Sequence, residues 1–245
     1  MSILKLKNIS KSFGKHKTLT DISLNIEKGQ IVGLIGPSGS GKTTLVKTII
    51  GMEKPDNGTV TVFNTKMPNR KILQNIGYMA QSDALYEDLS AKDNLIFFAN
   101  LFSLSKNEII DRITYLSKLV SLEDELNKKV KNYSGGMKRR LSLALALIQN
   151  PNLLILDEPT VGIDPVLRVN IWKELINLKN EGKSIIVTTH VMDEAEKCDH
   201  LKLIRDGKII ASGSPLSLKE KFNVSTIEEV FLLSGGKIYE NNSLS

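Results

Sequence analysis

The 245-residue sequence lacks the cysteines that a disulfide scaffold or a multi-cysteine zinc module would need, because it has only one, Cys198. It also lacks any stretch of the roughly 18 consecutive apolar residues that a membrane-spanning helix requires. The nearest candidate, residues 141–148, is shorter and follows three basic residues. No apolar signal region is recognisable near Met1. We therefore expect a soluble, intracellular chain in which Cys198 is a small buried or half-buried residue.

Intrinsic disorder and a coiled coil are excluded by composition. Hydrophobic residues make up 41% of the chain, and its 17 glycines and 7 prolines are scattered along it. The length allows one large domain or two small ones. The net charge of +6 is spread along the chain and favours anionic partners only weakly. Nucleic acid is not expected as a partner.

Hydrophobic periodicity predicts an α/β fold. Alternating or wholly apolar segments predict strands at residues 3–13, 21–26, 31–35, 58–63, 153–156, 184–188, 201–204 and 208–211. Helical spacing predicts helices at residues 44–50, 93–104, 106–120, 138–149 and 168–180. Strands that alternate with helices indicate parallel βαβ units. The helical block at about 82–150 is interpreted as a lobe inserted into one α/β domain.

One glycine-rich motif points to a nucleotide. Residues 36–43 read Gly-Pro-Ser-Gly-Ser-Gly-Lys-Thr, which fits G-x-x-x-x-G-K-[ST] between a buried strand and a helix. The glycines let several backbone N–H groups converge on one phosphate, and the helix N-terminus adds positive potential. Lys42 is expected to reach the β- and γ-phosphates and Thr43 to hold Mg²⁺.

An acidic pair supplies the chemistry that a phosphate site needs. Asp157 and Glu158 follow the buried strand at 153–156, so Asp157 is a candidate Mg²⁺ ligand and Glu158 a candidate general base toward water.

A second small-residue element, Ser134-Gly135-Gly136, opens a predicted helix and resembles another anion cradle. One nucleotide does not need two cradles in the same chain.

In chain order the motifs are the glycine-rich loop, Ser134-Gly135-Gly136, an apolar run ending in Asp157-Glu158, and His190 at the end of the next predicted strand. This order resembles the ATP-binding subunit of an ATP-binding-cassette (ABC) transporter, over nearly the whole chain. The resemblance implies a P-loop NTPase core with a mixed sheet, an antiparallel β subdomain and an inserted helical signature subdomain. It places the nucleotide-binding domain at residues 1–225, with the helical subdomain at about 82–150 and a short tail at 226–245.

The resemblance also assigns roles to residues. It implies contacts to ATP from Phe13, Gly36, Pro37, Ser38, Gly39, Ser40, Gly41, Lys42, Thr43, Thr44, Ser134, Gly135, Gly136 and Asp164. Catalysis is assigned to Lys42, Gln81, Glu158 and His190, and Mg²⁺ binding to Thr43, Gln81 and Asp157. The two cradles are explained by a head-to-tail dimer, in which Ser134, Gly135 and Gly136 meet the ATP held by the other subunit.

The implied subunit is Mg²⁺- and ATP-dependent and works with a separate transmembrane permease and a second ATP-binding subunit, in a homodimer or a heterodimer. It is expected in the cytoplasm, on the inner face of the cell membrane. The run at 133–141 and the end at 226–235 resemble exporter-type subunits, and residues 86–95 resemble the region where the membrane subunit docks. Met137 and Tyr133 depart from the commonest signature. The basic run 138–140 is interpreted equally well as a solvated helix face.

Other functions remain open at this stage. A soluble ABC ATPase of the cofactor-assembly type has a compatible length, and an importer subunit belongs to the same family. Importers often carry a C-terminal regulatory domain, for which only about 20 residues remain after the predicted core. A GTPase is disfavoured, because Asn127-Lys128-Lys129-Val130 lacks the aspartate of a guanine-reading motif.

Overall fold

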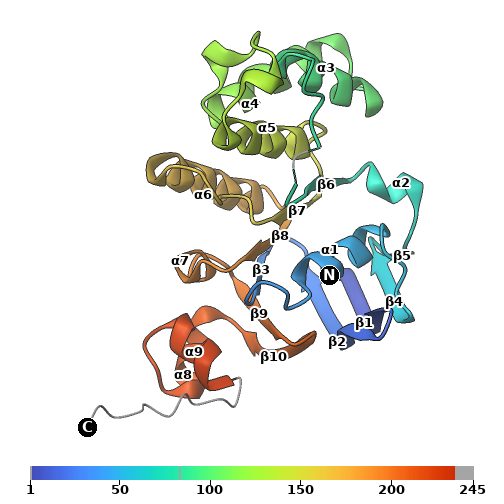
Figure 1. Cartoon of the computed structure of the whole chain (residues 1–245), viewed down its shortest axis with the longest axis vertical. Coiled ribbons are helices and arrows are strands. Elements are labelled where there is room, and N and C mark those ends of the chain that lie inside the picture. Colours follow the sequence, from blue (N-terminus) through green and yellow to red (C-terminus); the bar gives the residue numbers. More distant parts are fainter. Residues whose placement is uncertain (1, 83, 235–245) are drawn as a thin grey trace.

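A six-stranded sheet forms the centre of the computed structural model, which describes residues 2–82 and 84–234 (Figure 1). Its order is β10-β9-β3-β8-β7-β6. The strands are β3 (Ile31–Ile35), β6 (Ile76–Met79), β7 (Leu153–Asp157), β8 (Ser184–Thr189), β9 (His200–Arg205) and β10 (Lys208–Gly213). All neighbours pair in parallel except β10, which runs antiparallel to β9. The mixed sheet is therefore confirmed.

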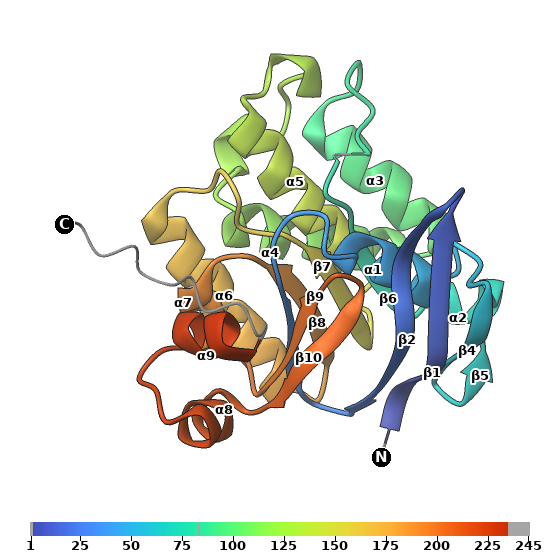
Figure 2. The ribbon, with the colours of Figure 1, turned by 60° about the horizontal axis from the view of Figure 1, so that its bottom comes forward.

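A second, antiparallel sheet stands beside the first (Figure 2). Its order is β2-β1-β4-β5, with β1 (Ser2–Phe13), β2 (His16–Glu27), β4 (Asn57–Val62) and β5 (Thr65–Lys66). Along β1, Leu4 and Leu6 are buried while Lys5 and Lys7 are exposed, as expected for a sheet with one solvated face. This sheet is the expected antiparallel β subdomain.

The central sheet separates two hydrophobic cores. On β3, Ile31 and Ile35 belong to the core under the helical lobe, whereas Val32 and Leu34 belong to the core shared with α1 (Lys42–Ile50) and the antiparallel sheet. β3 is buried at every position, which explains why its sequence is apolar without alternation. Both faces of the strand that leads into the glycine-rich loop are thus fixed by packing.

Three helices and two short 3₁₀ turns form the helical lobe, at the top of Figure 1. They are α3 (Ala91–Leu101), α4 (Lys106–Leu119) and α5 (Gly135–Leu147), with turns at Glu123–Glu125 and Val130–Asn132. Each helix has a serine N-cap, and the caps are Ser90, Ser105 and Ser134. α5 begins three residues earlier than the sequence predicted, because the Ser134 hydroxyl accepts the N–H of Met137 across two helical glycines.

Several short elements were not predicted. The strand β6 was not predicted because it has only four residues and contains Gly77. Glycine is needed there, since a Cβ would lie 2.0 Å from the carbonyl oxygen of Ala146 on α5. The short helices α2 (Arg70–Leu73) and α7 (Met192–Ala195) are a single turn each. One-turn elements carry too little periodicity to be recognised in a sequence.

The described C-terminal part folds back onto the core. After α6 (Pro165–Asn180), the last helices are α8 (Pro215–Phe222) and α9 (Ile227–Ser234). α9 buries Val230 and its Phe231 carbonyl accepts a 2.9 Å hydrogen bond from Arg205. Of the tail expected at 226–245, residues 235–245 lie outside the described residues. In the part of the chain that is described, no helix has the length and hydrophobicity to cross a membrane.

Candidate functional site

The loop at residues 36–41 joins β3 to α1, and its geometry requires glycine. A Cβ on Gly36 would lie 2.2 Å from the carbonyl oxygen of Ile204. Gly41 has a φ of 102°, and a Cβ there would lie 2.9 Å from the carbonyl oxygen of Thr18. No described side chain caps the N-terminus of α1. Its backbone N–H groups are therefore free to hold a phosphate group.

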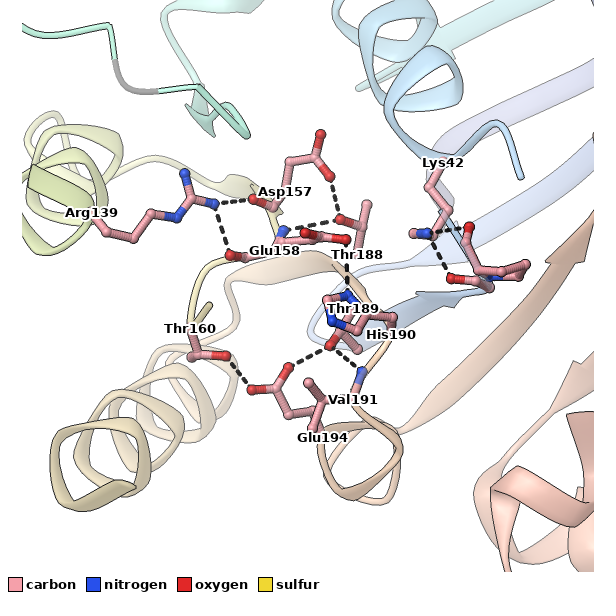
Figure 3. Close-up of polar contacts among 12 residues, drawn as sticks. Lys42, Arg139, Asp157, Glu158, Thr160, Thr188, Thr189, His190, Val191 and Glu194 are labelled. Atoms are coloured by element: carbon pink, nitrogen blue, oxygen red, sulfur yellow. Dashed lines mark hydrogen bonds and ion pairs between the residues drawn. The ribbon is translucent and has the colours of Figure 1, made fainter. Parts of the chain in front are cut away.

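Lys42, the first residue of α1, turns back onto this loop. Its Nζ donates hydrogen bonds to the carbonyl oxygens of Gly36 at 2.7 Å and Pro37 at 3.0 Å (Figure 3). Burial lowers the pKa of Lys42, and the nearby carboxylates of Glu158 and Asp157 oppose that shift. The ammonium group thus lies in the electrostatic field of both acidic candidates, where it can bind a phosphate.

Asp157 ends β7 with its carboxylate almost fully buried. One oxygen accepts a hydrogen bond from the Thr188 hydroxyl, and Oδ2 has no hydrogen-bond partner among the described residues. The Ser40 hydroxyl in the glycine-rich loop is likewise buried without a partner there. Buried polar atoms without partners are costly unless a ligand, water or ion satisfies them. The free carboxylate oxygen of Asp157 has the chemistry of a Mg²⁺ ligand, since Mg²⁺ prefers oxygen ligands and carboxylates above all.

Glu158 and His190 meet next to Asp157 (Figure 3). The Nδ1 atom of His190 lies 3.1 Å from Oε1 of Glu158. Glu158 has a φ of 53°, and its N–H donates to the carbonyl oxygen and the hydroxyl of Thr188, at 3.1 Å and 3.0 Å. A positive φ is uncommon for a residue with a side chain and is found at functional sites. The histidine side chain is half exposed, so it can reach a ligand.

A cavity of about 180 Å³ joins the glycine-rich loop to three of the four candidate catalytic side chains, while His190 and Asp157 do not line it. Its lining residues come from four separate segments and are Thr18, Ser38, Gly39, Gly41, Lys42, Thr43, Thr44, Gln81 and Glu158. The structure thus brings together residues that the sequence separates by more than 100 positions. Thr18 was not predicted, because a lone threonine in a strand carries no signal of its own.

Other candidates lie outside this cavity. Phe13 ends β1 with a half-exposed ring, 5.1 Å from the ammonium group of Lys11. Ser134 caps α5 and Asp164 caps α6, each through its side chain. The signature Ser134–Gly136 does not line the cavity of its own chain. If these residues touch ATP, the nucleotide is held by another copy.

The basic run at 138–140 is not the solvated face that the sequence allowed. Arg139 is buried, and its guanidinium donates to the carbonyl oxygens of Asp157 and Glu158 (Figure 3). It also donates to the carbonyl oxygens of Ala80 and Gln81. Arg140 donates to carbonyl oxygens at the end of α4. Helical spacing could have indicated that Arg139 is buried, because it lies four residues before the buried Leu143, on the same face of the helix.

The comparison with known sequences agrees with this geometry. The sequence profile described as "ABC transporter" matches residues 19–161. "Nod factor export ATP-binding protein I" of Cupriavidus metallidurans is 39% identical over 94% of this chain and 77% of its own length. "ABC transporter G family member 23" of Dictyostelium discoideum is 43% identical over 94% of this chain, which spans only about a third of that protein.

Solved structures show the same fold. The ATP-binding subunit of an ABC transporter superposes with a TM-score of 0.89 at 26% identity, covering 95% of this chain and 99% of that one. A dimeric ATP-binding cassette in a post-hydrolysis state, bound to ADP and Pi, gives a TM-score of 0.80 at 29% identity, covering 86% and 98%. The chain therefore belongs to the ABC transporter family, in which it is a Mg²⁺-dependent, ATP-hydrolysing cassette.

Proposed function

We propose that this chain is the energy-providing subunit of an exporter, in which ATP hydrolysis drives a separate transmembrane partner. The observation that supports ATP hydrolysis is the cavity lined by Lys42, Gln81 and Glu158. Lys42 and the glycine-rich loop bind the phosphates, while Thr43, Gln81 and Asp157 hold the Mg²⁺ that offsets phosphate charge. Glu158 accepts a proton from the attacking water. His190, in contact with Glu158, interacts with the γ-phosphate.

Each complete site is proposed to need two chains. Ser134 and Gly135 are exposed, and a Cβ on Gly135 would meet no atom within 4 Å. These signature residues therefore face open space rather than the cavity of their own chain. A head-to-tail dimer gives them a phosphate to bind, namely that of the partner's ATP. The similarity to a dimeric cassette supports this arrangement.

A membrane partner has a groove to occupy. A mostly apolar cavity of about 540 Å³ lies between the helical lobe and the core, with lining residues that include Met52, Leu73, Tyr78, Phe98 and Phe102. Apolar concave surfaces of this size are typical binding sites. We place the cytoplasmic part of the transmembrane partner there, which puts the chain on the inner face of the membrane. The export direction is supported by the names of the Nod factor export relatives.

The dimeric site is tested by mixing two inactive variants, Ser134→Ala and Glu158→Gln. A heterodimer of the two has one site with both lesions and one site with neither, since each site takes Glu158 from one chain and Ser134 from the other. We expect ATPase activity to return on mixing, which a phosphate-release assay measures. Heterodimers that form, as shown by two affinity tags, yet stay inactive would contradict the composite site.

A further inference from the structure

A buried carboxylate behind the site is not explained by the roles assigned so far. Glu194 lies on α7 with only 2% of its surface exposed. Its Oε2 accepts a 2.7 Å hydrogen bond from the Thr189 hydroxyl, and its Oε1 accepts a hydrogen bond from the Thr160 hydroxyl (Figure 3). Oε1 also accepts a hydrogen bond at 3.3 Å from Nε1 of Trp172. It forms no ion pair within the described chain. A buried carboxylate is tolerated only when hydrogen bonds satisfy it, so these three donors fix its position.

Two of these donors flank the catalytic pair. Thr189 directly precedes His190, and its hydroxyl also accepts the N–H of Val191 at 3.0 Å, so the turn that carries the histidine is held on both sides. Thr160 lies two residues after Glu158, where the chain leaves β7 for α6. The Glu194 carboxylate therefore joins the segment that follows Glu158 to the segment that carries His190.

We infer that Glu194 is a positioning residue, which holds His190 against Glu158 by joining these two segments. The inference rests on the proposed roles of Glu158 and His190 in ATP hydrolysis. A carboxylate suits this task because its two oxygens accept from two hydroxyls at once, one on each segment. Loss of the link frees the histidine to move, and a displacement of about 1 Å at a catalytic group costs up to about 100-fold in rate.

The test compares Glu194→Gln and Thr189→Val with wild type in the full-length chain. Thr189→Val keeps the shape of the side chain but removes the hydroxyl that links Glu194 to the turn. We expect kcat for ATP hydrolysis to fall about 10- to 100-fold in both variants, while KM for ATP changes less than about threefold. Ser117→Ala is the matched control, because it removes a buried hydroxyl of α4 in the helical lobe.

A double-mutant cycle with His190→Ala separates positioning from a purely structural role. If Glu194 acts through the histidine, Thr189→Val adds no further loss of kcat in a His190→Ala background. Unchanged kcat in the folded Thr189→Val and Glu194→Gln variants, or losses that multiply with His190→Ala, would overturn the inference. Full activity of Glu158→Gln would instead overturn the proposed function, so the two failures are distinguishable.

Discussion

At the scale of single residues, the position of Glu158 is set by its neighbour strand rather than by its own side chain. Its N–H donates to both the carbonyl oxygen and the hydroxyl of Thr188, on β8, and these bonds hold a backbone whose φ is 53°. Asp157, one position earlier, is buried, and its Oδ2 has no hydrogen-bond partner in the described part of the chain. The two adjacent acids thus have different environments: that of Asp157 suits binding of an ion, and that of Glu158 suits proton transfer.

The role of Glu158 as proton acceptor can be tested separately from nucleotide binding. Glu158→Gln removes the proton acceptor while keeping the size of the side chain, so kcat should fall by about 10²–10⁴ with ATP affinity retained. Lys42→Ala is the contrasting variant, since it removes a phosphate ligand and should abolish nucleotide binding. Phosphate release and equilibrium binding of labelled ATP measure the two effects. Turnover near the wild-type rate in Glu158→Gln would rule out the role of general base.

At the scale of elements, α5 connects the helical lobe to the end of β7. The Arg139 guanidinium bonds carbonyl oxygens of residues 80 and 81, after β6, and of residues 157 and 158, at the end of β7. A planar guanidinium serves four acceptors in a fixed arrangement, which a lysine ammonium does not reproduce. The Arg139 side chain therefore links α5 to the backbone of Gln81 and Glu158 at the same time.

The second prediction tests this connection with Arg139→Lys. The substitution keeps the charge but leaves some carbonyl oxygens without donors, and each lost hydrogen bond to a charged group costs about 1.5–3 kcal/mol. We expect ATPase activity to fall about tenfold or more. Arg140→Lys on the same helix is the matched control, because among the described residues Arg140 donates to the carbonyl oxygens of residues 120 and 121 instead. Equal activities of the two variants would contradict a specific role for Arg139.

Element by element, strong periodicity decided what could be predicted. The buried strands β3, β7 and β8 were recognised from uninterrupted apolar runs, and the glycine-rich loop and the acidic pair were placed through them. β6 was missed because Gly77 and its short length erase the pattern. Arg139 and Glu194 were missed for a different reason. Their burial depends on hydrogen-bond partners from other segments of the chain, whereas a charged residue considered alone is expected to be exposed to solvent.

At the scale of the whole molecule, the nucleotide cavity and the apolar groove share one segment of chain. Gln81 lines the cavity, while its neighbours Ala80 and Ser82 line the groove. Occupation of either space therefore acts on the same backbone, which Arg139 holds at Ala80 and Gln81. This continuity gives a physical route by which a partner in the groove and ATP in the cavity affect each other.

The last prediction places the membrane partner in the groove. Met52→Glu puts a charge on a 66% exposed side chain that lines the groove, so desolvation of the carboxylate should weaken docking without disturbing the fold. Ile110→Glu is the matched control, because Ile110 is 62% exposed on α4 and does not line the groove. After expression in the source cells, we expect Met52→Glu to leave the membrane fraction for the supernatant and Ile110→Glu to sediment with the membranes. Both isolated variants should hydrolyse ATP at the wild-type rate, since neither residue contacts the nucleotide cavity. Equal sedimentation of the two variants would place the partner on another surface.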